Sequence, residues 1–148
     1  MIDKNIQNTC TDVYTNVRKW IDKIYDIDIN NMQGACAIAS YTLYRSLKKK
    51  GYSADFVLAW NEDAYEGHAW IEINNYVIDL TYKQFNYIFE NDILIIKKEE
   101  YSRNIPTINN FNIIYKNRKA IKEVKTWTKN QNPFNYLRQI NSYLRKIN

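Results

Sequence analysis

The sequence is poor in histidine, cysteine, glycine and proline: its 148 residues include one His, two Cys, three Gly and two Pro. So few Gly and Pro residues argue against a disordered or linker-rich chain. Two cysteines are too few for a disulfide framework. Together with the single histidine, they also fall short of a structural zinc site, which usually takes four Cys or His ligands. We therefore expect neither a metal nor any other cofactor.

Long apolar runs are missing as well. No segment approaches the roughly 18 apolar residues that a membrane span needs. The first residues, MIDKNIQNTCTD, contain no apolar stretch of the kind found in signal sequences. We therefore expect no membrane association and a cytoplasmic, reducing location, in which the cysteines remain free thiols.

The charge balance is moderately basic, with 21 Lys+Arg against 16 Asp+Glu and a formal net charge of +5. A solvated basic surface is the simplest interpretation. Nucleic-acid binding is the alternative, but the chain contains no aromatic RNA-binding signature, zinc-finger spacing or Gly-rich phosphate loop. A hydrophobic content of 45% and an aromatic content of 15% predict one globular domain over residues 1–148 with an aromatic core.

Hydrophobic periodicity predicts an α+β fold. The expected helices cover residues 11–24, 36–50, 117–127 and a segment that begins at Asn132. The expected strands are 54–60, 68–73, 76–80 and 93–96, and the last should be interior because it is wholly apolar. Residues 26–33, 61–67 and 103–112 should be turns or irregular segments. In this fold, helix 36–50 packs against a mostly antiparallel sheet, flanked by helices from both termini.

Strands 68–73 and 76–80 should form a hairpin around Asn74-Asn75, because Asn tolerates a positive φ. Residue 73 then faces 76, and 71 faces 78. One face of the hairpin is apolar, and the other carries His68, Trp70, Glu72, Val77, Asp79 and Thr81. His68 and Asp79 are diagonal neighbours on that face, within reach of each other's side chains. The carboxylate could therefore orient the imidazole.

Cys36 is expected to begin a helix, where unpaired N–H groups and a partial positive charge favour a thiolate. Its backbone N–H, with the side chain of Gln33 as a candidate second donor, could bind an oxyanion. Each residue, taken singly, also has a structural explanation. Cys36 could be a core residue, His68 a hydrogen-bonded structural residue, and Asp79 a cap or turn former. Taken together, they predict a nucleophile, a base and an orienting carboxylate. Cys10 has no such context.

Residues 34–85 resemble the core of transglutaminase-like proteins, in the papain-like cysteine enzyme superfamily. The stretch GACAIASYTLYRSLKKKGYSADFVLAW is similar to the nucleophile helix and following strand of that family. GHAWIEI resembles its histidine strand, and YVIDLT its aspartate strand. The resemblance implies the same roles for Cys36, His68 and Asp79. The arrangement also looks like the leader-peptide proteases of lasso-peptide maturation. Papain-type proteases carry Trp directly after the nucleophile, whereas this chain has Ala37, so Gln33 is not implied by homology.

These observations predict a cysteine-dependent acyl-transfer enzyme that acts on peptide or glutamine-type amides through a thioester, with water as the usual acceptor. Its substrate would be a peptide or a protein. Trp70 and Tyr82 are candidates for lining the substrate cleft, with core packing as the alternative for both. The alternatives for the whole domain are a protein cross-linking transglutaminase and a catalytically inactive binding or regulatory domain of the same fold.

Overall fold

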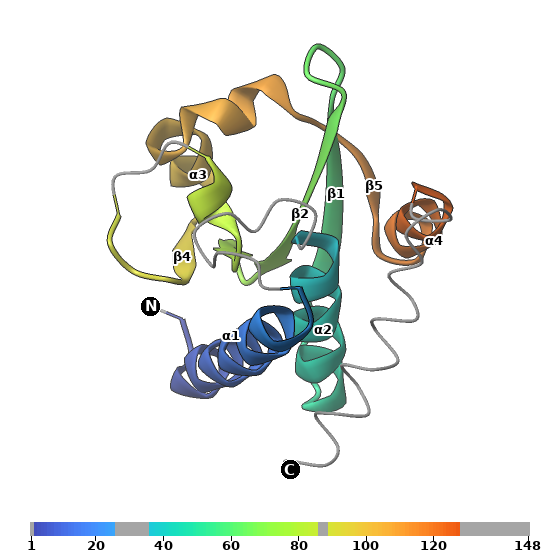
Figure 1. Cartoon of the computed structure of the whole chain (residues 1–148). Coiled ribbons are helices and arrows are strands. Elements are labelled where there is room, and N and C mark those ends of the chain that lie inside the picture. The colour runs from blue at the N-terminus through green and yellow to red at the C-terminus, as the bar shows by residue number, and fades with distance from the viewer. Residues whose placement is uncertain (1, 26–35, 86–88, 128–148) are drawn as a thin grey trace.

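The computed structural model describes residues 2–25, 36–85 and 89–127, and they fold as an α+β unit, as predicted (Figure 1). The helices and strands, in chain order, are α1 (Lys4–Tyr25), α2 (Cys36–Lys49), β1 (Asp55–Asn61), β2 (Glu66–Ile73), β3 (Tyr76–Asp79), β4 (Leu94–Lys97), α3 (Lys98–Asn104), β5 (Asn112–Lys116) and α4 (Asn117–Trp127). Two 3₁₀ turns are also present, η1 (Tyr82–Gln84) and η2 (Pro106–Asn110).

The sheet has the strand order β4-β3-β2-β1-β5, and every neighbouring pair is antiparallel. The predicted hairpin is confirmed, because Ile73 pairs with Tyr76 and Ile71 pairs with Ile78. Asn74 and Asn75 adopt φ values of 50° and 67° in the turn between β2 and β3. This register fixes which side chains share a face, since a slip of one residue would exchange the two faces.

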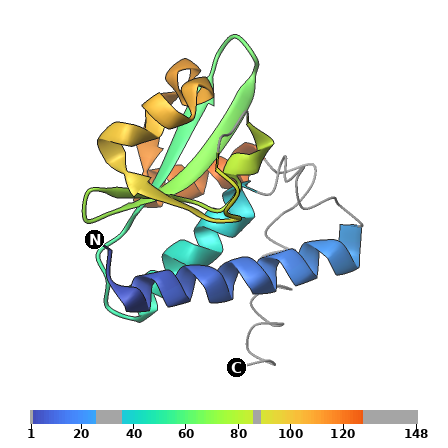
Figure 2. The same ribbon diagram turned by 90° about the vertical axis from the view of Figure 1, so that its left-hand side faces the viewer.

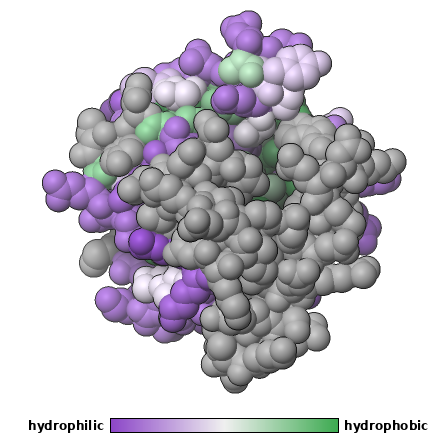
Figure 3. Space-filling model, in the orientation of Figure 1, coloured by the Kyte–Doolittle hydropathy of each residue, from purple (hydrophilic) through white to green (hydrophobic). Residues whose placement is uncertain are grey.

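The helices cover the two faces of the sheet separately (Figures 1 and 2). On one face, α1, α2 and α4 bury the apolar side of the hairpin. Figure 2 shows α1 running beneath the sheet. On the other face, α3 and η2 cover the side that includes Trp70 and Val77. In Figure 3, hydrophilic side chains (purple) make up most of the coloured surface, and hydrophobic ones (green) show mainly in the upper half.

Helix α2 ends as the sequence predicts. Gly51 follows it with φ +88°, a value that L side chains rarely adopt. The N–H of Tyr52 donates to the carbonyl of Leu47 at 3.0 Å, and the N–H of Gly51 donates to that of Lys48 at 3.0 Å. This pair of bonds is the Schellman arrangement, which satisfies the last carbonyls of the helix.

Helix α1 begins at Lys4, well before the predicted start at residue 11. Asp3 accepts the N–H of Asn5 at 2.6 Å, at the start of the helix. Ile2, Ile6 and Cys10 recur every fourth residue and are buried, so the apolar stripe reaches back into a segment that is polar in average composition. The prediction missed this stripe because the residues between its members are polar.

Strand β4 lies at the edge of the sheet, so the prediction of an interior strand was wrong. Its Leu94 and Ile96 are buried in one core, while Ile93 and Ile95 pack against the other. The strand is apolar throughout because both of its faces pack against a hydrophobic core, although it lies at the edge of the sheet. The region 103–112 was also wrongly expected to be irregular throughout, because it includes the end of α3, the turn η2 and the start of β5.

The predicted helix 117–127 is confirmed as α4. The predicted turn at 26–33 and the helix from Asn132 lie outside the described residues. Within residues 2–25, 36–85 and 89–127, no helix has the length and apolar character needed to cross a bilayer.

Candidate active site

His68 on β2 and Asp79 at the end of β3 form a buried pair. Both side chains are 0% exposed, and His68 Nε2 lies 2.8 Å from Asp79 Oδ2. The hairpin register brings them onto one face, as predicted from the sequence. Because the carboxylate accepts at Nε2, that nitrogen carries a proton. The other ring nitrogen, Nδ1, is then the one that can exchange a proton with a nucleophile.

Asp79 has further partners that the sequence analysis did not identify. Its Oδ1 accepts the backbone N–H of Thr81 at 2.9 Å, and its Oδ2 accepts the hydroxyl of Tyr101 at 2.6 Å. Burial alone would raise the pKa of Asp79. The charge of His68 and the hydrogen bonds from His68, Tyr101 and Thr81 lower it instead. Asp79 is therefore held as a carboxylate.

Cys36 is the first residue of α2 and is 8% exposed, and its side chain lies close enough to His68 to contribute to the raised pKa of the ring. Since Nε2 is bonded to Asp79, we assign the sulfur contact to Nδ1. Burial alone would lower the pKa of His68, but the charge of Asp79 and the hydrogen bonds with Asp79 and Cys36 raise it to about 10. The raised pKa makes the protonated ring accessible at neutral pH, beside the carboxylate of Asp79.

Gln84, in the turn η1, also reaches the imidazole. Its Nε2 lies 3.0 Å from His68 Nδ1 and 3.2 Å from Oγ1 of Thr81. The sequence analysis missed this residue because periodicity does not describe a single 3₁₀ turn. Its proximity to Asp79 along the chain was the one available signal.

Aromatic rings surround His68. Ring centroids lie 4.7 Å away for Phe85, 5.7 Å for Trp70 and 6.0 Å for Phe111. Phe85 and Phe111 also contact each other, at 5.7 Å. Such a setting keeps water from the ring and strengthens its interactions with nearby charges. Phe111 follows η2, far along the chain, so no local pattern could have placed it here.

The two residues predicted to line a cleft are core residues in this structure. Trp70 is 3% exposed and donates through Nε1 to Glu72 at 3.3 Å. Tyr82 is 0% exposed, and its hydroxyl donates to the carbonyl of Asn91. The packing alternative therefore describes both side chains. Gln33, the predicted oxyanion donor, lies outside the described residues.

Glu72 has a structural position on the same face. Its carboxylate lies 3.2 Å from Nζ of Lys98 and 3.2 Å from Nζ of Lys116. Lys98 begins α3, directly after the edge strand β4, and Lys116 ends β5, the strand at the opposite edge. The carboxylate of Glu72 on β2 therefore links the two edges of the sheet.

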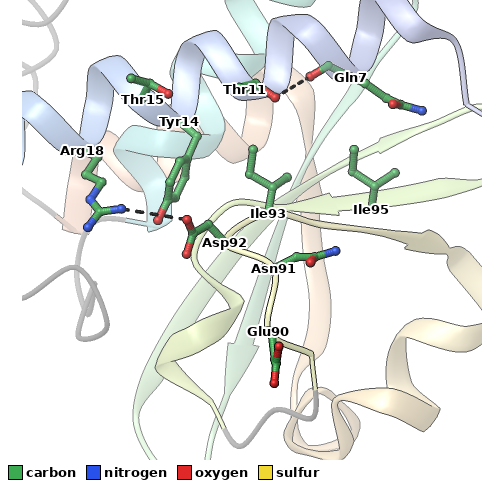
Figure 4. Close-up of a pocket in the computed structure, with 10 residues that line it drawn as sticks. All are labelled: Gln7, Thr11, Tyr14, Thr15, Arg18, Glu90, Asn91, Asp92, Ile93 and Ile95. Carbon is green, nitrogen blue, oxygen red and sulfur yellow. Dashed lines mark hydrogen bonds and ion pairs between the residues drawn. The ribbon is translucent and has the colours of Figure 1, made fainter.

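A hollow of about 590 Å³ separates α1 from the segment that leads into β4 (Figure 4). Arg18 and Asp92 approach each other across it at 3.9 Å, and Ile93 and Ile95 line it as well. Cys36, His68 and Asp79 do not line this hollow. It therefore adds nothing to the chemistry of the Cys-His-Asp cluster. Among the residues with described side chains, no group of three or more His, Cys, Asp or Glu is arranged to hold a metal ion.

Comparisons of the chain with family models, with curated proteins and with solved structures found no match.

Proposed function

We propose that this chain is a cysteine-dependent acyl-transfer enzyme with a papain-like, transglutaminase-like core, acting on peptide or glutamine-type amides. The observation that supports it most is the buried contact of 2.8 Å between His68 and Asp79, with Cys36 close enough to the same ring to raise its pKa. A sulfur, an imidazole and a carboxylate in series are the elements of an activated nucleophile. The three come from a helix start and two strands, in the order that the sequence resemblance implies.

In the first step, the Cys36 sulfur attacks the carbonyl carbon of the amide. The carbon–sulfur bond forms while the π electrons of the carbonyl move onto its oxygen. His68 then gives the proton on Nδ1 to the amide nitrogen, the carbon–nitrogen bond breaks, and an amine or ammonia leaves. Throughout, the carboxylate of Asp79 keeps the ring in orientation and balances its positive charge.

In the second step, water attacks the thioester and passes a proton to His68 Nδ1. The carbon–sulfur bond breaks, the carboxylic acid is released, and the sulfur returns as a thiolate beside the imidazolium. An amine in place of water would give a cross-link or a transferred acyl group. We propose hydrolysis as the reaction. Transamidation would give peptide products of a different mass.

The first test is the alkylation rate of each cysteine by iodoacetamide, followed by mass spectrometry. We expect Cys36 to react fast and Cys10 to remain unmodified, because Cys10 is 0% exposed and burial raises its pKa to about 12. His68→Ala should slow the modification of Cys36 by about 100-fold at slightly acidic pH, since no imidazolium then holds the thiolate. Cys10→Ala is the matched control and should keep the fast reaction.

The second test follows glutamine-containing peptides with wild type and with Cys36→Ala. Chain cleavage, loss of ammonia and cross-linking each give a different mass change. A product formed by wild type but not by Cys36→Ala supports an enzyme. The mass of that product shows whether water or an amine is the acceptor. A Cys36 that reacts no faster than a free thiol, with no product from any peptide, would contradict the proposal and favour a binding domain.

A further inference from the structure

Gln84 approaches the side of the His68 ring that faces away from Asp79. Its Nε2 lies 3.0 Å from His68 Nδ1, whereas Asp79 contacts Nε2 of the ring. The Cys36 side chain also lies close to this ring, and Nδ1 is the nitrogen we assign to it. The Gln84 amide and the Cys36 sulfur therefore belong to one side of the imidazole, the side on which the proposed reaction takes place.

The orientation of the Gln84 amide is fixed locally. One amide hydrogen points to Thr81 Oγ1, at 3.2 Å from Nε2, and the other points to Nδ1. The turn is closed by the bond from the N–H of Phe85 to the carbonyl of Tyr82, at 3.0 Å. Thr81 also donates its own N–H to Asp79 at 2.9 Å. The same turn thus positions the carboxylate on one side of the ring and the amide on the other.

The contact between Gln84 and Nδ1 depends on the proton of His68. A neutral imidazole accepts the Gln84 N–H at Nδ1, but a protonated Nδ1 is itself a donor and cannot accept it. When His68 carries its proton, one hydrogen of the Gln84 amide loses its acceptor. In the proposed reaction, this is also the state in which negative charge develops on the substrate oxygen.

We propose that Gln84 donates this hydrogen to the oxyanion of the tetrahedral intermediate and is a catalytic residue of the proposed acyl transfer. The inference rests on the proposed function. In the intermediate, the Cys36 sulfur and the oxyanion are bonded to one carbon, so a donor on the sulfur's side of the ring lies within reach of the oxygen. The backbone N–H of Cys36, the first described residue of α2, is the second donor that we propose.

The test compares two reactions of Cys36 that differ in one respect. Alkylation by iodoacetamide needs the thiolate but forms no oxyanion, whereas acylation by p-nitrophenyl acetate passes through one. Gln84→Met keeps the size of the side chain and removes both donors. We expect it to slow acylation by about 100-fold and to change alkylation by less than about twofold. Lys83→Ala in the same turn, whose amine pairs with Asp92 at 2.9 Å, is the control and should leave both rates within about twofold of wild type.

Three results would overturn the assignment. An acylation rate in Gln84→Met within about threefold of wild type removes Gln84 from the oxyanion site. Equal losses in acylation and alkylation would make Gln84 a residue that only positions His68. A loss of acylation in Gln33→Ala without one in Gln84→Met would transfer the role to Gln33. If the wild-type protein shows neither fast alkylation nor acylation, the proposed function fails first, and this role fails with it.

Discussion

At the scale of single residues, Asp79 organises the site. One of its oxygens accepts both the His68 ring at 2.8 Å and the Tyr101 hydroxyl at 2.6 Å, and the other accepts from Thr81. The pKa of Tyr101 lies well above its usual value, first because the residue is buried and then because the charge of Asp79 opposes its ionisation. Tyr101 therefore remains a neutral donor and tempers the negative charge that His68 experiences.

Tyr101→Phe tests this positioning role. The substitution removes the hydrogen bond but keeps the ring, whose centroid lies 5.3 Å from that of Trp70. We expect the pKa of His68, measured by NMR titration of its ring protons, to rise by several tenths of a pH unit, because Asp79 then stabilises the imidazolium more strongly. A purely structural role would lower stability without moving this pKa, so an unchanged pKa would contradict the positioning role.

The sequence predicted the His68–Asp79 pair because both residues belong to one hairpin whose register follows from its alternation of apolar and polar residues. It did not predict Tyr101 or Phe111. Both come from the segment that packs over the other face of the sheet, and long-range packing decides where their rings lie. Gln84 falls between these cases: it is near Asp79 in the chain, but only the geometry of the 3₁₀ turn directs its amide to the ring.

At the scale of elements, the contact between α2 and β2 holds Cys36, the proposed nucleophile, near His68, the proposed base. The hydroxyl of Ser40, one turn after Cys36, donates to the carbonyl of Ala69 at 3.0 Å in a buried position. Ala69 is the neighbour of His68. This hydrogen bond thus connects helix and strand close to Cys36 and His68.

Ser40→Ala should lower the free energy of unfolding by about 1–3 kcal/mol, because a buried bond is lost. It should also slow Cys36 alkylation, since the helix start is then held less firmly against His68. Urea denaturation and the alkylation assay measure the two effects. Ser46→Ala on the same helix is the control for the change in helix propensity. Equal stability of the two variants would show that the Ser40 bond contributes nothing.

Elements with a clear apolar pattern were predictable, and those without one were not. Helices α2 and α4 and the β2–β3 hairpin carry their apolar pattern and their turn residues within a few positions. Strand β5 has none of its residues buried, so it lacks the alternation by which a strand is recognised. Its place beside β1 follows from tertiary pairing alone.

At the scale of the whole molecule, the site and the stability of the fold are linked through the charge on His68. Folding raises the pKa of His68 from 6.5 to about 10. The resulting stabilisation is complete below the unfolded value and is lost as the pH rises through the folded value. Asp79 contributes in the opposite sense: its lowered pKa gives stabilisation that is present above its ordinary value of 3.8 and is lost in acid.

We therefore expect the free energy of unfolding to fall by on the order of 2–5 kcal/mol between pH 6.5 and pH 10. Denaturant titrations at a series of pH values measure this slope. His68→Asn removes the titrating group and should flatten the curve over the same range. Parallel curves for wild type and variant would mean that the His68 proton is not linked to folding.

The turn that follows β3 concentrates much of the site in one place. The histidine ring is contacted by the carboxylate of Asp79 and the amide of Gln84, and Thr81 bonds to both of these residues. All three residues come from 79–84, so a single residue inserted in this stretch would disturb both contacts with the ring. An insertion at 62–65, in the turn that joins β1 to β2, would leave them in register. Insertions should accordingly be tolerated in the turn at 62–65 and selected against in the turn at 79–84.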